Sequence, residues 1–215
     1  MKSEELASVI IRKGLAVMTT TSEKMPTPAD NVPGPLQGHW TYSHYAALSD
    51  DGQRYEILDG VLYLMPPSPS PWHQKATTRL SAFLVTHIEF AGLGEVFSGP
   101  LDVELAPDVV VQPDILVVLK DNCSKIISSH IVGAPDLVVE VASPSTAKYD
   151  RRKKYNAYAH AGVREYWIID PIKCTIEVLI LEAGTYHSAG VFRGDDLLPS
   201  LVVPRFPVRV KQIFK

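Results

Sequence analysis

The sequence predicts an α/β protein in which helices flank a mixed β-sheet and an antiparallel hairpin region adjoins that sheet. Three observations support this fold class. Residues 133–171 have the pattern of a strand, a helix and a second strand, which together form a compact crossover unit. An Asp-Gly pair at residues 59–60 is flanked by short apolar runs, and residues 73–90 show the spacing of an amphipathic helix. Strands and helices mixed in this way indicate one sheet covered by helices.

Composition limits the classes of protein that fit. With 215 residues, 46% of them hydrophobic and 21% charged, the chain suits one globular domain with an appendage rather than a disordered chain. A net charge of −3 argues against a protein that coats nucleic acid without specificity, although it permits a local basic patch. Cys123 and Cys174 lie far apart and show no metal-binding spacing, which favours free thiols in a reducing cytoplasm. The apolar run Ala7–Ile11 is too short for a membrane span or a signal peptide, so we expect a cytoplasmic protein with no membrane partner.

Residues 1–38 are expected to form a flexible, proline-rich extension, with the globular domain covering residues 39–215. Pro26, Pro28, Pro33 and Pro35 crowd into ten residues, a density typical of a linker. A short helix near residues 4–12 that docks on a partner is the alternative to a loose terminus.

The next elements follow in order. Tyr55–Leu58 and Val61–Met65 around Asp59-Gly60 predict a β-hairpin, and Glu56 lies on its first strand. The loop PPSPSP then leads into the helix over residues 73–90, where His73 either caps the helix or faces a site.

The apolar run over residues 109–119 is interrupted by Pro113, which Asp114 follows directly. Proline has no N–H group for a strand ladder, so this position indicates a bulge, a strand start or an edge strand. In each case the chain bends there, and a bend can aim the Asp114 side chain.

The run over residues 137–141 predicts a core strand that carries Glu140 in its middle. A buried carboxylate is costly unless it is paired, hydrogen-bonded or bound to a metal. We expect a helix from about Ala147 to Ala161, which ends at Gly162, and then a strand that ends at Asp170-Pro171. Strands over residues 175–181 and 186–191 predict an antiparallel margin.

Two acids and a lysine form the candidate constellation. If Asp114 and Glu140 lie on neighbouring strands, their carboxylates can converge on a divalent cation, and hard oxygen ligands suit Mg²⁺ or Mn²⁺. Lys154 could orient a water molecule or stabilise developing phosphate charge. Each residue has a simpler interpretation, because Asp114 suits a turn and Lys154 suits a solvated helix face, paired with Asp150. Only the set is informative.

The basic helix around Lys154 allows two interpretations. Residues 148–154, KYDRRKK, contain five basic residues and one acid in a chain that is acidic as a whole. Such a patch suits contact with phosphates. It equally suits a solubilising helix face, and charge alone does not decide between the two.

Several ordered motifs resemble those of one family: YEILDG, SPSPWHQ, QPD, PDLVVEVASPST and YAHAGVREYWIIDP. From Trp40 to the C-terminus the chain is similar to the bacterial putative restriction endonuclease family of the PD-(D/E)XK nuclease superfamily. The resemblance implies a restriction-endonuclease-like core and magnesium-dependent cleavage of a phosphodiester, with Asp114 and Glu140 as metal ligands.

One position departs from the superfamily pattern, since Ala142 occupies the place of the usual lysine. The resemblance suggests that the lysine role has moved to Lys154, with Lys153 as the competing choice. Lys154 has the same helix face as Tyr158. The resemblance also assigns Glu56 to the catalytic set and His73 to substrate binding near the site, and the basic patch adds Arg151 and Lys153 as substrate-binding residues.

The leading hypothesis is a Mg²⁺-dependent endonuclease, with Mn²⁺ as a substitute metal and DNA as the expected partner. Two alternatives come from other classes: a non-catalytic module that binds nucleic acid or a partner protein, and a metal-free hydrolase that uses the two carboxylates as acid and base. Cleavage of both strands of a duplex is simplest with two active sites related by a two-fold axis, which predicts a homodimer.

Overall fold

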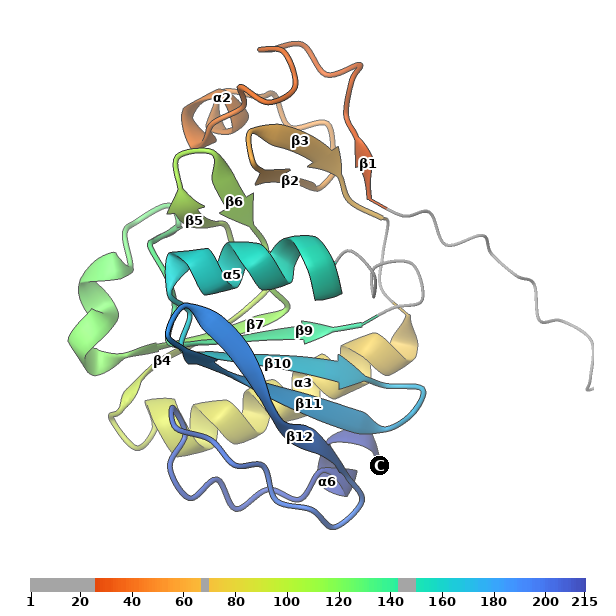
Figure 1. Ribbon diagram of the computed structural model, residues 1–215, viewed down its shortest axis with the longest axis vertical. Coiled ribbons are helices and arrows are strands. Elements are labelled where there is room, and N and C mark those ends of the chain that lie inside the picture. The colour runs from red at the N-terminus through yellow and green to blue at the C-terminus, as the bar shows by residue number, and fades with distance from the viewer. Residues whose placement is uncertain (1–25, 67–69, 143–149) are drawn as a thin grey trace, which may run out of the picture.

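A computed structural model describes residues 26–66, 70–142 and 150–215, apart from the side chains of residues 150 and 151. In this part of the chain, two six-stranded β-sheets pack with helices between and beneath them (Figure 1). The main sheet has the order β12-β11-β10-β9-β7-β4, and the second sheet has the order β1-β3-β2-β6-β5-β8. The fold class predicted from the sequence is confirmed.

The strands of the main sheet are β4 (Gly94–Ser98), β7 (Ile115–Leu119), β9 (Leu137–Val141), β10 (Glu165–Asp170), β11 (Thr175–Glu182) and β12 (Thr185–Arg193). Those of the second sheet are β1 (Thr27–Pro28), β2 (Tyr55–Leu58), β3 (Val61–Leu64), β5 (Val103–Ala106), β6 (Val109–Val111) and β8 (Ile131–Val132). The α-helices are α2 (Tyr42–Ala46), α3 (Pro71–Leu84), α5 (Tyr155–Ala161) and α6 (Lys211–Phe214). The π-helical turns η1 (Val85–Glu89) and η3 (Asp150–Lys154) and the 3₁₀ helix η2 (Lys120–Lys125) complete the set.

The crossover unit is the centre of the main sheet. Strands β9 and β10 are parallel, and α5 lies on the connection between them. Gly162 ends α5 with a φ of 88°, a left-handed conformation that glycine adopts without steric cost. Strands β11 and β12 add the expected antiparallel margin, while β4 and β7 extend the other side.

The predicted hairpin is present, and it belongs to a second sheet. Asp59 and Gly60 both have positive φ, as the tight Asp-Gly turn between β2 and β3 requires. A Cβ atom on Gly60 would lie 2.5 Å from the carbonyl oxygen of Gly38, so the chain passes too close for any other residue. Asp-Gly at this turn therefore also fixes where the preceding segment packs.

Part of the extension that was expected to be flexible packs on the second sheet. Thr27 and Pro28 pair with β3, and the amide of Ala29 donates a 2.8 Å hydrogen bond to the carbonyl of Leu62. Ala29 is buried beside Trp40 and the outer face of β2 and β3. Residues 27–29 thus contact the second sheet, residues 1–25 lie outside the described residues, and the flexibility of the extension stays a prediction. The division of the chain at residue 38 stays a prediction.

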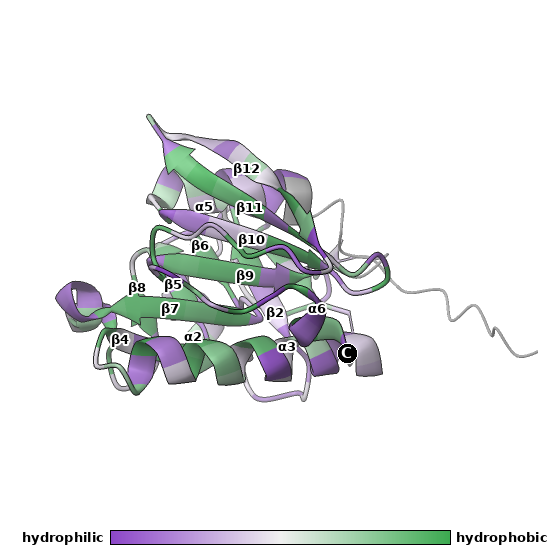
Figure 2. Cartoon of the chain, turned by 90° about the horizontal axis from the view of Figure 1, so that it is seen from below, coloured by the Kyte–Doolittle hydropathy of each residue, from purple (hydrophilic) through white to green (hydrophobic). Residues whose placement is uncertain are grey.

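Alternation along the strands separates two apolar layers on the main sheet. One face packs against α3, η1, α6 and the C-terminal segment, and the other face packs against α5 and the second sheet (Figures 1 and 2). Strands β7 and β9 are mainly hydrophobic because both of their faces are covered. Helix α5 is therefore enclosed between the two sheets.

The apolar run over residues 109–119 forms two strands in different sheets. Strand β6 ends at Val111 in the second sheet, and β7 begins at Ile115 in the main sheet. Gln112 and Pro113 form the corner between them. Of the three alternatives that Pro113 raised, the strand start is the one observed, and Asp114 is the last residue before β7.

No helix among the described residues is both long enough and apolar enough to cross a lipid bilayer.

Candidate active site

Glu140 lies on the face of β9 that meets α5. Val139 and Val141 belong to the apolar layer against α3, whereas Val138 belongs to the layer against α5, so alternation places Glu140 on the α5 side. Its side chain is enclosed, with only 4% of the residue exposed. The Nζ atom of Lys154 donates to Oε1 of Glu140 at 2.9 Å, and the hydroxyl of Tyr158 donates to the same oxygen at 2.7 Å.

Lys154 is buried, with 2% of the residue exposed, and it contacts two carboxylates at once. Its Nζ atom lies 2.8 Å from Oε1 of Glu56 as well as 2.9 Å from Oε1 of Glu140. Lys154 and Tyr158 are four residues apart, one helical turn, and they therefore reach the same carboxylate. The solvated helix face, which was the simpler interpretation of Lys154, is wrong.

Lys153 points elsewhere. Its residue is exposed, and its ammonium contacts the ring and the hydroxyl of Tyr63 on β3. The side chain of Arg151, the other basic residue predicted to bind substrate, lies outside the described residues, as does any contact of Asp150. Of the two candidate lysines, Lys154 is the one that meets Glu140.

Glu56 reaches this point from the second sheet. It lies on β2, where all four residues are buried, and its Oε1 atom accepts a 3.0 Å hydrogen bond from the backbone N–H of Gln112. Its other oxygen, Oε2, is buried and has no hydrogen-bond partner among the described residues. A buried carboxylate oxygen without a partner is costly, and such an atom calls for an explanation.

Gln112 anchors the corner between the sheets through its side chain. Its Oε1 atom accepts from Nε of Arg54 at 3.0 Å, and its Nε2 atom donates to Oδ1 of Asp102 at 2.8 Å. These bonds fix the backbone whose N–H holds Glu56. Sequence reasoning missed this role, although Gln112 belongs to the QPD motif.

Asp114 completes the cluster. Ile115 pairs with Val139 in the antiparallel register of β7 and β9, so Asp114 continues that register opposite Glu140. Its Oδ2 atom accepts a 2.8 Å hydrogen bond from the backbone N–H of Val141 and lies 3.1 Å from Nε2 of His73. The two candidate metal ligands therefore occupy the same end of neighbouring strands.

His73 faces the site rather than capping α3. The cap is Ser70, whose hydroxyl accepts a hydrogen bond from the N–H of His73. The imidazole uses Nε2 toward Asp114, while Nδ1 lies 3.5 Å from the hydroxyl of Thr77 one turn later. The first turn of α3 thus brings an imidazole to the acid at the start of β7.

The electrostatics of the cluster favour a cation. Burial raises the pKa of Tyr158 well above its usual value, and the charge of Glu140 raises it further, so the hydroxyl stays protonated and acts as a donor. Glu56, Asp114 and Glu140 contribute three negative charges against the single positive charge of Lys154, a formal total of −2 for these four residues. Uncompensated charge in a buried cluster is unfavourable.

The residues present fit a magnesium ion better than a metal held by protein side chains alone. No group of three or more His, Cys, Asp or Glu side chains able to hold a metal occurs among the described residues. Mg²⁺ characteristically binds one or two carboxylates and completes its shell with water and substrate phosphate. Asp114 and Glu140 supply hard oxygen ligands of that kind, and a divalent cation would balance the formal charge of the cluster.

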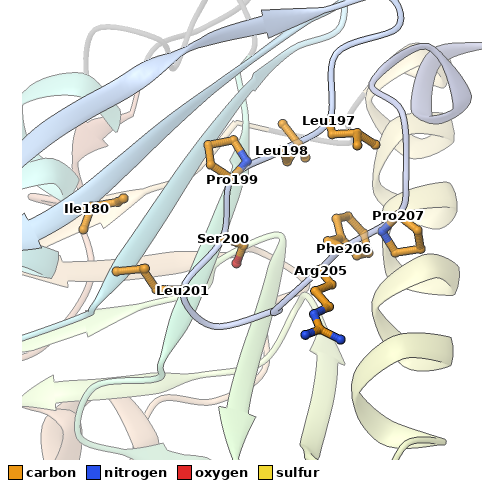
Figure 3. Close-up of a pocket in the computed structure, with 9 residues that line it drawn as sticks. All are labelled: Ile180, Leu197, Leu198, Pro199, Ser200, Leu201, Arg205, Phe206 and Pro207. Carbon is orange, nitrogen blue, oxygen red and sulfur yellow. The ribbon is translucent and has the colours of Figure 1, made fainter.

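A second buried glutamate lies on the opposite face of the sheet. Glu165, the first residue of β10, accepts hydrogen bonds from the indole of Trp167, the hydroxyl of Ser200 and the N–H of Val202. Burial raises the pKa of Glu165 above its usual value. Sequence reasoning did not single this residue out. Ser200 also lines an apolar hollow of about 520 Å³, shown in Figure 3, that contains none of the clustered residues described above.

Comparisons with known proteins place the chain in a family. A family model described as "Uma2: Putative restriction endonuclease" matches residues 42–211, most of the chain. The chain belongs to the Uma2 family. All five residues that the structure brings together, Glu56, His73, Asp114, Glu140 and Lys154, lie inside the region matched to Uma2. The resemblance inferred from the motifs is confirmed.

Two individual proteins support the Uma2 assignment. The uncharacterized protein slr1290 of Synechocystis sp. is 30% identical over 128 residues, which are 59% of this chain and 65% of that protein, less than two thirds of its length. The crystal structure of a putative nuclease belonging to DUF820 from Anabaena variabilis aligns with a TM-score of 0.66 at 21% identity, and it covers 81% of this chain and 97% of the other. At that identity the likeness concerns the fold.

Proposed function

We propose that the chain is a Mg²⁺-dependent endonuclease that hydrolyses phosphodiester bonds of DNA. One observation carries the proposal: a buried lysine lies between two buried glutamates from different sheets, and an aspartate sits opposite one of them at the end of the neighbouring strand. Structural cores rarely bury so many charges together. Membership in the Uma2 family, whose model is described as "Putative restriction endonuclease", supports the same reaction.

Asp114 and Glu140 would hold Mg²⁺, and Mn²⁺ would serve in its place. When bound, such an ion lowers the pKa of a coordinated water and stabilises negative charge on the phosphate. Lys154 orients the attacking water and is itself held in place by Glu56 and Glu140. Tyr158 keeps the Glu140 carboxylate in one orientation, and the N–H of Val141 does the same for Asp114.

The remaining assigned residues contact the substrate in this proposal. His73 contacts Asp114, and an imidazole in that position can meet a phosphate oxygen of the substrate. Lys153 and Arg151 precede Lys154 on the basic turn and supply positive charge for the DNA backbone. Exposure of Lys153 on that turn suits such a contact.

A plasmid-nicking assay tests the proposal. The wild-type protein should convert supercoiled plasmid to the nicked form with Mg²⁺ or Mn²⁺ and should stop with EDTA. Glu140→Ala should abolish the reaction with circular dichroism unchanged, because a metal ligand is lost. Glu95→Ala is the matched control, since it removes an exposed carboxylate from β4 of the same sheet and should retain full activity.

Two results would refute the proposal. Nicking that survives Glu140→Ala would remove this residue from the reaction. DNA binding without cleavage under every metal condition would favour the alternative, a module that keeps the nuclease fold and binds nucleic acid or a partner protein without turnover.

We also propose a homodimer, because cleavage of both strands is simplest with two sites related by a two-fold axis. Sedimentation analysis of the full chain with and without DNA tests it, and a monomer in both conditions would contradict it. The cytoplasmic location stays a prediction from the composition.

A further inference from the structure

A groove of about 340 Å³ lies at the start of α3, on the side of the main sheet that α3 and α6 cover. Trp72, Lys75 and Ala76 form its wall on the helix, while Pro171 and Ile172 form the wall that follows β10. Residues of α6 close the far side. The groove is apolar except for Lys75, the one charged residue among those that line it.

The groove and the carboxylate cluster share the same end of the main sheet. Strands β9 and β10 run parallel and lie side by side (Figure 1). Beyond the end of β9, the N–H of Ala142 donates to the carbonyl of Ile169 at 2.7 Å. Glu140 is near the end of β9, and Pro171 directly follows the end of β10. On α3, Trp72 directly precedes His73, which contacts Asp114. Consecutive helical residues project about 100° apart, so Trp72 enters the groove while His73 faces the acid.

Trp72 is an unusual surface residue. It is 63% exposed, whereas Trp40 and Trp167, the other two tryptophans of the chain, are buried. The ammonium of Lys75 lies 5.5 Å from the centroid of its ring, which places a positive charge against the indole. Helix α3 contains no acidic residue, and Arg79 follows Lys75 by one turn. An exposed aromatic ring with a cationic neighbour is the combination that binds the bases and phosphates of an unpaired strand.

We propose that this groove binds an unpaired nucleobase next to the phosphate that is cleaved, stacked on Trp72, so that the preferred substrate is single-stranded DNA or a duplex containing an unpaired nucleotide. The proposal rests on the proposed function, because it names the substrate class of the same site. Bases inside an intact duplex are covered on both faces by their neighbours and offer no ring face to an indole. Phosphate groups do not stack on an indole ring, whereas every unpaired base presents a face for stacking. Lys75 can meet the phosphate of the same nucleotide.

Tryptophan fluorescence gives a direct test, since Trp72 is the exposed one of the three. The full-length protein is titrated in EDTA, which prevents cleavage, with single-stranded DNA, with a matched intact duplex, and with that duplex carrying one unpaired nucleotide. The single strand and the unpaired nucleotide should quench the emission, and the intact duplex should not. Trp72→Phe should remove the quenching but keep most of the affinity, measured by anisotropy of a labelled strand.

Truncation of the ring gives the quantitative arm. Trp72→Ala should weaken binding of the single strand by about 5-fold to about 150-fold, the range that loss of one stacked base produces. Phe90→Ala is the matched control, because Phe90 is also an exposed aromatic residue but follows η1, at the far end of the α3 segment. That variant should bind as the wild type does.

The outcomes separate this inference from the proposed function. Equal binding of intact duplex and single strand, with Trp72→Ala unchanged, would overturn the groove proposal even if the protein nicks plasmid. Quenching by the single strand in a protein that cleaves no DNA would support the groove as a nucleic-acid site and refute the nuclease. Absence of quenching by every DNA, with a labelled peptide or protein bound through Trp72 instead, would overturn the proposal.

Discussion

Two buried glutamates on neighbouring parallel strands have different surroundings. Glu140 on β9 meets an ammonium and lies near two further acids, whereas the donors that Glu165 on β10 meets among the described residues are neutral: an indole, a hydroxyl and backbone amides. Both residues are enclosed, Glu140 within the apolar run of β9 and Glu165 at the first position of β10. The comparison teaches that burial of an acid does not by itself indicate a site. What distinguishes Glu140 is charge gathered from other elements, because neutral donors can fully satisfy a structural carboxylate.

The largest effect should follow from removing the buried ammonium of Lys154, which pairs with Glu140. Lys154→Met leaves two buried carboxylates without it, and we expect the free energy of unfolding to fall by about 3 to 5 kcal/mol in urea titrations. Lys173→Met is the control, since it breaks an ion pair of equal length, 2.8 Å to Asp170, that lies at the surface. That variant should change stability by at most about 1 kcal/mol. Similar losses in both would mean that burial of Lys154 is unimportant.

Replacing each glutamate by glutamine, the isosteric amide, should affect the nicking rate differently at the two positions. Glu140→Gln removes a proposed metal ligand and should lower the nicking rate by about 100-fold to about 1000-fold, the size expected for one preorganised electrostatic contact. Glu165→Gln should nick plasmid at the wild-type rate once its folded fraction is matched by circular dichroism. A comparable loss in Glu165→Gln would erase the functional contrast between the two faces of the sheet.

Removing a tyrosine hydroxyl should lower the stability more when its hydrogen-bond acceptor is charged than when the acceptor is neutral. Tyr158 donates to the Glu140 carboxylate and Tyr186 to the backbone carbonyl of Val163, both at 2.7 Å. Hydrogen bonds to charged groups contribute about 1.5 to 3 kcal/mol and those to neutral groups about 0.5 to 1.5 kcal/mol. Thermal and urea unfolding of Tyr158→Phe should therefore show the larger loss relative to Tyr186→Phe. The reverse order would argue that Glu140 is neutral in the folded protein.

The smallest expected effect is a pH dependence of the free energy of unfolding that arises from Glu165. Burial raises the pKa of Glu165, so between its usual pKa and the raised value the folded state keeps a proton that the unfolded state has lost. The stability that this residue contributes therefore increases as the pH falls through that interval. Urea unfolding of wild type and Glu165→Gln between pH about 4 and about 7 should show wild type gaining relative to the variant at the acidic end. A difference that is constant with pH would contradict the raised pKa.

Local sequence signals predicted most of the individual elements. The Asp-Gly turn predicted the β2–β3 hairpin, Gly162 the end of α5, and the valine run a buried strand that carries Glu140. The four-residue spacing of Lys154 and Tyr158 correctly selected Lys154 over Lys153 as the partner of Glu140. These features depend on residues that are close in sequence, where spacing fixes direction.

Features that depend on distant segments were not accessible. The run from Val109 to Leu119 shows strand character throughout, and nothing in its period reveals that its halves enter different sheets. Glu56 was assigned only through the family resemblance, and the N–H of Gln112 that holds it comes from a residue 56 positions away. Glu165 passed unnoticed because its donors Ser200 and Val202 lie in a C-terminal segment without a motif. Burial and pairing of polar groups are tertiary properties, which one-dimensional patterns do not contain.

The position of Lys154 between Glu56 and Glu140 has a consequence for how the protein opens. One acid belongs to each sheet, so separating the sheets would leave at least one buried charge without its partner. The free-energy cost of that loss is far above the cost of exposing ordinary side chains. The corner at Gln112 links the same two acids through the backbone. We therefore expect the two sheets to form a single cooperative unit, with amide protons of β2 and β9 exchanging at the same free energy of opening. We therefore expect the cluster proposed for catalysis also to couple the unfolding of the two sheets.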